Sequence, residues 1–145
     1  PTLWESEEVM IQTINDIASK ADIVLPGTGE GKILMGSEKP EEIAEFYRKN
    51  GAKAVIIKAG GDGAYADWEG GKGFYPGYKV EKVVDTVGAG DGFAVGILSA
   101  WLEGKEMPDM VDRGNAIGSI QVSVSSDNEG LPTREELDAY MKGAK

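Results

Sequence analysis

Residues 85–91 read Asp-Thr-Val-Gly-Ala-Gly-Asp, and the apolar run of residues 92–102 follows at once. The glycines relax the backbone, so a turn here can open a helix with successive N–H groups aimed at one point. The positive end of the helix adds to these donors and makes the turn a candidate anion site. Asp91 stands among the donors, which is the position of a general base beside a transferred phosphoryl group.

The spacing of this stretch alone leaves two interpretations open. In the first, the stretch is a tight loop in which Asp91 only caps the following helix. In the second, Asp91 is a catalytic base, and the backbone N–H groups beside it neutralise charge that grows on the phosphoryl group.

The longer string Asp-Thr-x-Gly-Ala-Gly-Asp-Gly-Phe, residues 85–93, resembles the second signature of the ribokinase-like (PfkB) family of carbohydrate kinases. In that family the last aspartate is the catalytic base and the Gly-Ala-Gly backbone forms the anion hole. The resemblance therefore assigns the base to Asp91 and the anion hole to Gly88, Ala89 and Gly90.

Composition narrows the chemistry further. The chain has 145 residues, 41% of them hydrophobic, which is enough to bury a core, and 25 acidic residues against 15 basic ones give a net charge of −10. The spread of this charge argues against a nucleic-acid or membrane partner. Histidine and cysteine are absent, which excludes Ser-His triads, thiolate chemistry and disulfides. We expect a cytoplasmic protein, because no stretch is typical of a signal peptide or a membrane span.

Helical and strand patterns alternate along the chain, as in a doubly wound α/β sheet. Predicted helices cover residues 7–18 and 40–49, and residues 28–35 are predicted to form a short helix or turn. A long helix follows Asp91, and two more helices start near Pro108 and Thr133. Predicted strands cover residues 22–25, 53–58, 64–68 and 73–76. The helix after Asp91 is apolar nearly all round, so we expect it to be buried. The resemblance implies a three-layer α/β/α ribokinase-like sheet, of which this chain is the C-terminal part.

A second glycine-rich loop, residues 59–65, follows the apolar strand 53–58. Ligands of open α/β sheets gather at the carboxyl ends of strands, which favours a nucleotide contact here. A plain hairpin turn at Asp62-Gly63 is the alternative. In the PfkB family a Lys-x-Gly-x-x-Gly string at this place lies along ATP. The positions that this implies for nucleotide binding are Lys58, Gly60 and Gly63, with Gly61 in the same loop.

Three more site residues follow from the resemblance. Family members carry Asn-x-x-Glu after an earlier strand, and this pair helps to hold Mg²⁺ near the nucleotide phosphates. Here Glu30 matches the glutamate, whereas Gly27 stands in place of the asparagine, and a purely capping role for Glu30 stays open. In some members the positions of Asp85 and Thr86 help to place a monovalent cation, which makes K⁺ a candidate cofactor beside ATP and Mg²⁺.

Asn115 interrupts the apolar stripe of the helix that starts near Pro108. A polar residue at such a place is most often hydrogen-bonded within the core. The resemblance favours the other interpretation, because helices at this place in the family carry an asparagine near the adenine.

From residue 22 to the end, the order of elements resembles the nucleotide-binding C-terminal half of a PfkB kinase. We therefore expect residues 1–145 to form a single partial domain, without the sugar-binding N-terminal half and its β-lid. Residues 113–118 and 127–135 most resemble the 2-keto-3-deoxygluconate kinase branch.

Two functional hypotheses remain open. The first is a sugar kinase that transfers the γ-phosphoryl group of ATP to a sugar or keto-sugar acid, for which 2-keto-3-deoxygluconate is the candidate. The second is a nucleotide-binding or regulatory module without sugar phosphorylation. We expect the 145-residue chain alone to be inactive. We also expect copies of it to associate through a strand edge that the missing half would cover.

Overall fold

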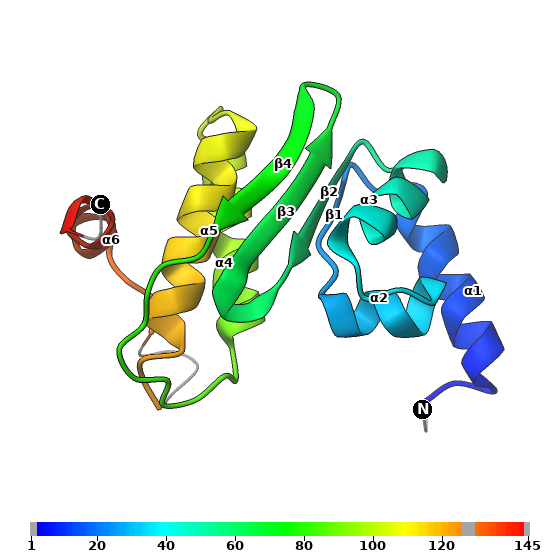
Figure 1. Ribbon diagram of the computed structural model, residues 1–145, viewed down its shortest axis with the longest axis horizontal. Coiled ribbons are helices and arrows are strands. Elements are labelled where there is room, and N and C mark those ends of the chain that lie inside the picture. Colours follow the sequence, from blue (N-terminus) through cyan, green and yellow to red (C-terminus); the bar gives the residue numbers. More distant parts are fainter. Residues whose placement is uncertain (1–2, 126–129, 144–145) are drawn as a thin grey trace. The chain divides into compact units, whose positions relative to one another are not determined.

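The computed structural model describes residues 3–125 and 130–143 of the chain (Figure 1). Within these residues six α-helices and four strands occur, which confirms the predicted α/β class. The chain divides into two compact units. The first unit is described over residues 3–59 and 65–73, and the second over residues 60–64, 74–125 and 130–143.

The four strands form one mixed sheet in the order β1-β2-β3-β4. Their bounds are Ile23–Val24 for β1, Ala54–Lys58 for β2, Gly63–Trp68 for β3 and Gly71–Pro76 for β4. β1 and β2 run parallel, with Ile23 opposite Ala54 and Val24 opposite Val55. β3 and β4 are joined by the short turn at residues 69–70, so this pair is an antiparallel hairpin.

Three helices belong to the first unit, and local sequence signals set their ends. They are α1 (Glu7–Ala18), α2 (Thr28–Met35) and α3 (Pro40–Lys49). Ser6 caps α1, because its Oγ accepts the Val9 N–H at 3.2 Å. α2 ends at Gly36 with φ +88°, and α3 starts at Pro40, as expected for these residue types.

The core of the first unit lies between α3 and β2. Ala54, Val55, Ile56 and Ile57 are all buried, as predicted for a strand covered on both faces. Ile43, Ala44 and Tyr47 from α3 pack into the cluster that also contains Val55 and Ile57.

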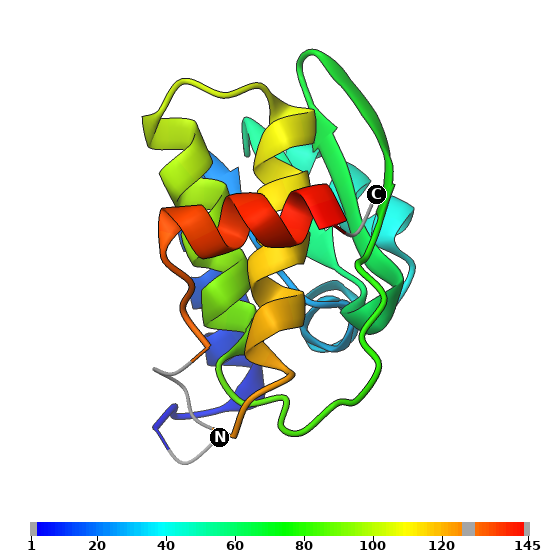
Figure 2. The same ribbon diagram turned by 90° about the vertical axis from the view of Figure 1, so that its left-hand side faces the viewer.

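The second unit contains the helices α4 (Ala89–Leu102), α5 (Met107–Gln121) and α6 (Arg134–Gly143). α4 and α5 lie side by side over their length, and α6 crosses α5 (Figures 1 and 2). Leu137 of α6 packs with Ala116 and Ile117 of α5. None of the helices that the structure describes is long and apolar enough to cross a membrane.

Small residues allow the backbones of α4 and α5 to touch. A Cβ atom added at Gly96 of α4 would lie 2.6 Å from the Gly114 Cα and 2.7 Å from the Arg113 carbonyl oxygen of α5. Neither of these backbone atoms can move aside without the whole helix, so Gly96 admits no side chain at this crossing.

The prediction that α4 is buried all round is wrong. One face is buried, including Phe93, Ile97 and Ala100, whereas Val95, Leu98 and Leu102 are 45%, 44% and 83% exposed. Apolar residues occur on both faces of the helix, but their sequence does not indicate whether a neighbouring element covers each face. In the described part of the chain, α5 covers one face only.

We expect Gly96→Ala to destabilise the protein by about 1–3 kcal/mol, because the new methyl group forces α4 and α5 apart. The measurement is the free energy of unfolding from urea titration. Gly118→Ala is the matched control, because a Cβ there would lie 3.5 Å from the nearest atom, the Ala89 carbonyl oxygen, at ordinary van der Waals distance. The control should be neutral or up to about 1 kcal/mol more stable, since alanine favours the helix. Equal stability of Gly96→Ala and the parent would contradict the close crossing.

Candidate active site

The N-terminus of α4 is an uncapped cluster of backbone donors. Gly88 precedes the helix with φ +77°, a conformation that favours glycine, and it has no side chain to cap the first turn. The first helical bond runs from the Gly92 N–H to the Gly88 carbonyl at 2.8 Å. In the described structure the N–H groups of Gly90 and Asp91 have no protein acceptor, and that of Ala89 makes only a long 3.4 Å contact with the Thr86 carbonyl. These donors and the helix dipole can hold an anion.

Asp91 lies in the first turn of α4 and its side chain is exposed. No ion pair to Asp91 occurs among the residues that the structure describes. The carboxylate is therefore accessible to a hydroxyl group from solution, beside the same N–H groups that can hold a phosphate. This is the arrangement that a general base for phosphoryl transfer needs.

The segment before α4 is fixed to the end of α5. The N–H groups of Val84 and Asp85 both donate to the Val122 carbonyl, at 2.8 and 3.3 Å. One carboxylate oxygen of Asp85, Oδ1, accepts the Val87 N–H at 3.0 Å and so shapes the turn. Thr86 is exposed beside it. A role of Asp85 and Thr86 in holding K⁺ stays a prediction.

The glycines of the second loop divide into two kinds. Residues Gly60–Asp62 form a 3₁₀ turn before β3. Gly63 has φ +120° and no room for a side chain, because a Cβ there would run into the Tyr75 carbonyl oxygen and lie 2.5 Å from the Gly77 nitrogen. A Cβ at Gly60 or Gly61 would meet no atom within 4 Å. The fold therefore requires glycine at position 63, whereas Gly60 and Gly61 leave the backbone accessible to a ligand.

Lys58 and Glu30 lie in the first unit. Lys58 ends β2, where its N–H donates to the Pro26 carbonyl at 2.9 Å, and it forms a parallel bridge with Gly27. Glu30 caps its own helix, because its Oε2 accepts the Gly27 N–H at 2.6 Å. No group of three or more acidic side chains that could hold a metal ion occurs in the part of the chain that the structure describes. The capping role of Glu30 is thus observed, and its metal role stays a prediction.

Asn115 is hydrogen-bonded within the protein. It is 7% exposed, and its Nδ2 lies 3.3 Å from the Tyr75 carbonyl oxygen and 3.2 Å from that of Pro76. Carbonyl oxygens only accept hydrogen bonds, so the amide NH₂ group must face them. The interior hydrogen bonds expected for a polar residue in an apolar stripe are present, and a contact with adenine stays a prediction.

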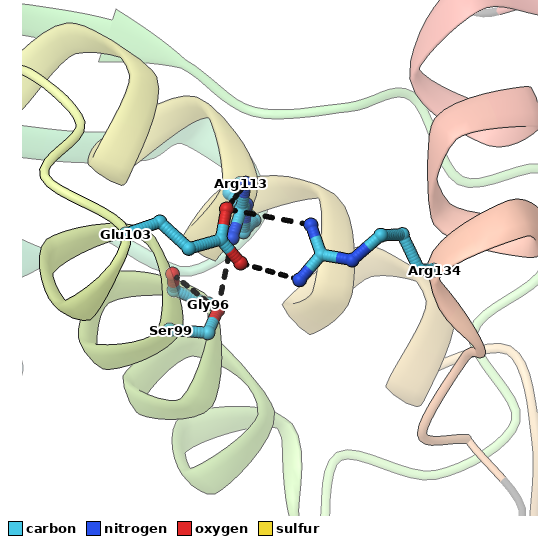
Figure 3. A network of polar contacts seen from close by, with 5 residues as sticks. All are labelled: Gly96, Ser99, Glu103, Arg113 and Arg134. Atoms are coloured by element: carbon cyan, nitrogen blue, oxygen red, sulfur yellow. Dashed lines mark hydrogen bonds and ion pairs between the residues drawn. The ribbon is translucent and has the colours of Figure 1, made fainter.

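A network of charges joins the three helices of the second unit (Figure 3). Glu103 at the end of α4 accepts from Arg113 of α5 at 2.9 Å and from both terminal nitrogens of Arg134, the first residue of α6. Arg113 also donates to the Ser99 Oγ at 3.3 Å. The two guanidinium groups, Arg113 foremost, lower the pKa of Glu103 from its usual 4.5 to about 2. The sequence does not indicate this network, because its members lie 10 to 31 positions apart and no spacing pattern connects them.

The low pKa of Glu103 predicts how the network depends on pH. A carboxyl group whose pKa falls on folding stabilises the protein above the unfolded pKa, and this contribution is lost as the pH falls towards the folded pKa. We therefore expect Glu103→Gln to be less stable than the parent at neutral pH and the difference to shrink between about pH 4.5 and about pH 2. The measurement is the free energy of unfolding across pH 2–7. Glu81→Gln, an exposed loop substitution, is the control, and a pH-independent difference for Glu103→Gln would contradict the network.

The sequence of this chain matches a known protein family. The sequence profile described as pfkB family carbohydrate kinase matches residues 1–134. The chain is 49% identical over 145 residues to 2-dehydro-3-deoxygluconokinase of Bacillus subtilis (strain 168), and the match covers 100% of this chain and 45% of that protein. The chain therefore spans about half the length of the curated relatives it matches.

Solved structures agree with this similarity. The crystal structure of the PfkB protein from Polaromonas sp. JS666 has a TM-score of 0.83 and 50% sequence identity, covering 96% of this chain and 43% of that chain. A putative ribokinase II from E. coli in complex with ATP and Mg²⁺ has a TM-score of 0.84 at 25% identity, over 92% of this chain and 43% of that chain. The ribokinase-like fold expected from residues 85–93 is thereby confirmed.

Proposed function

Because the chain belongs to the pfkB family of carbohydrate kinases, we propose that it supplies the ATP-binding and catalytic part of a sugar kinase. The observation that carries this proposal is the uncapped N-terminus of α4, where free N–H groups and the exposed carboxylate of Asp91 share one helical turn. A residue that only caps a helix does not require free N–H groups beside it. Phosphoryl transfer requires a base and an anion-binding site together.

The proposed reaction uses the residues of the α4 N-terminus in defined roles. The Asp91 carboxylate accepts the proton of the acceptor hydroxyl, and the oxygen attacks the γ-phosphorus of ATP. The bond from that phosphorus to the β–γ bridging oxygen breaks, and ADP leaves with the electron pair. Backbone N–H groups at Gly90 and Asp91 stabilise the negative charge on the transferred group. Gly88 permits the turn that leaves these groups free.

The nucleotide is proposed to lie along the loop of Gly60 and Gly61, with Lys58 at the end of β2. Mg²⁺ bound with ATP would neutralise phosphate charge during transfer. Glu30 fits a role towards it, because capping engages only Oε2 and leaves Oε1 for a metal-bound water. Asp85 and Thr86 are the residues proposed to hold K⁺. The cytoplasm is the proposed location of the reaction, because intracellular ATP would supply the phosphoryl group.

The proposed acceptor is 2-keto-3-deoxygluconate, a synonym of 2-dehydro-3-deoxygluconate. The support is the 49% identity to the kinase named for that substrate. The chain spans 45% of that relative. The proposed acceptor must therefore be tested on a catalytically complete form of the protein.

One observation favours a second candidate, a nucleotide-binding or regulatory module without sugar phosphorylation. Gly27 stands where the family has an asparagine, and its backbone, at φ −87° and ψ 164°, is open to any residue. The glycine is therefore not demanded by the fold. An assay of ADP release with sugars and keto-sugar acids, on a catalytically complete form, separates the two candidates.

Asp91→Asn should lower kcat by about 10²–10⁴-fold, because the amide cannot accept the hydroxyl proton in the transition state. ATP affinity should stay within several-fold of the parent value. The measurements are steady-state kinetics and ATP titration on the catalytically complete enzyme. Asp109→Asn is the matched control, since Asp109 is an acidic residue in the first turn of α5. An Asp91→Asn enzyme with near-parental turnover would refute the assignment of the base.

Gly90→Val should weaken ATP binding while the fold is kept, because a branched side chain would occupy the space where phosphates approach the backbone. Titration calorimetry measures the binding, and circular dichroism checks the fold. Gly73→Val in β4 is the control, because a Cβ at Gly73 would meet no atom within 4 Å. Unchanged ATP affinity in the Gly90→Val protein would indicate a purely structural turn.

A further inference from the structure

Asn115 connects α5 to the end of β4. Its amide NH₂ group donates to the carbonyl oxygens of Tyr75 and Pro76, the last two residues of the strand, at 3.3 and 3.2 Å. The side chain is 7% exposed, so water does not readily replace these bonds. Removal of the amide would leave the carbonyl groups of Tyr75 and Pro76 without their donor from the buried Asn115 side chain.

The end of β4 is in turn locked to the loop that precedes β3. The N–H of Gly77, the next residue, donates to the Asp62 carbonyl at 2.9 Å. A Cβ at Gly77 would lie 2.6 Å from the Gly61 carbonyl oxygen, and a Cβ at Gly63 would strike the Tyr75 carbonyl oxygen. With backbone packed on backbone, residues 75–77 and residues 61–63 can move only together.

We propose that Asn115 is a positioning residue, which holds the Gly60–Gly63 loop in its nucleotide-binding form through Tyr75, Pro76 and Gly77. This inference rests on the proposed function, in which Gly60 and Gly61 lie along ATP. It differs from a contact of the Asn115 NH₂ group with adenine, because that group is already directed at the two β4 carbonyls. In the proposed role Asn115 acts on the phosphate-binding backbone, and a contact of its Oδ1 with the base is the alternative that the first experiment tests.

A loop that binds through its backbone needs a fixed position, since no side chain can compensate for a shift. In Asn115→Leu the apolar side chain has similar size but cannot donate to the carbonyls. We expect its KM for the nucleotide to rise about tenfold, the size expected when two carbonyl groups lose their hydrogen-bond donor, with kcat within about twofold.

The first experiment measures kcat and KM for ATP and for GTP on the catalytically complete enzyme. Positioning predicts that Asn115→Leu lowers kcat/KM by the same factor for both nucleotides, because the loop has moved for both. A loss confined to ATP, with GTP unaffected, would show a direct base contact and overturn the proposal.

Gly77→Ala tests the same connection with Asn115 intact and covers the case in which Asn115→Leu does not fold. Its methyl group would push against the Gly61 carbonyl, so it should raise the KM for both nucleotides as well. Ser119→Ala is the matched control. Ser119 is a buried polar residue of the same helix whose Oγ lies 2.9 Å from the Tyr140 hydroxyl and bonds the Ala116 carbonyl. It should lower stability without changing either KM, and a KM rise equal to that of Asn115→Leu would overturn the proposal.

Amide hydrogen exchange separates failure of this inference from failure of the proposed function. In Asn115→Leu and Gly77→Ala, exchange in peptides covering residues 60–64 and 75–78 should accelerate, and in Ser119→Ala it should not. Parental exchange in both variants would refute the connection whatever the enzyme phosphorylates. Faster exchange in a protein without kinase activity would refute the proposed function and leave the mechanical connection standing.

Discussion

The second unit depends on the contact of two backbones where α4 crosses α5. Gly96 and Gly114 bring the helices so close that no side chain fits at Gly96, and this approach sets the direction of α4. Since a helix is stiff, the direction of α4 also sets where its first turn, with Asp91, is presented. Asn115 follows Gly114 in the sequence, so one turn of α5 touches α4 on one side and the end of β4 on another. The same short stretch of α5 therefore helps to position both glycine-rich segments, the turn before α4 and the loop before β3.

The glycines of the two segments contribute in different ways. Gly63, Gly77 and Gly96 give room for close packing of backbone on backbone, whereas Gly60 and Gly61 leave backbone exposed. A glycine-rich segment thus contains glycines that pack against other backbone and glycines whose backbone is free to bind a ligand. The sequence does not distinguish the two kinds, and only the structure around each glycine does.

Local signals made much of the fold predictable. The Ser6 cap, the Pro40 start and the Gly36 end act within one helical turn, and so does the box in which Glu136 accepts the Thr133 N–H at 2.7 Å. Residues 85–93 likewise indicated the ribokinase-like fold. The partners of Asn115 lie 39 and 40 positions away, and those of Glu103 up to 31, so no spacing revealed them. The sequence predicts a fully buried α4, and one face is exposed instead, because apolar composition does not show whether another element covers that face.

The carboxylate of Glu103, shared by two guanidinium groups, restricts the order in which substitutions can accumulate. Loss of Glu103 first leaves Arg113 without the carboxylate that it pairs with, and the Arg113 side chain is only 12% exposed. Loss of Arg134 first is milder, because its side chain is 60% exposed and Arg113 still pairs with Glu103. Divergent sequences of this unit can therefore reach an uncharged junction of the three helices at a smaller loss of stability when Arg134 is replaced before Glu103.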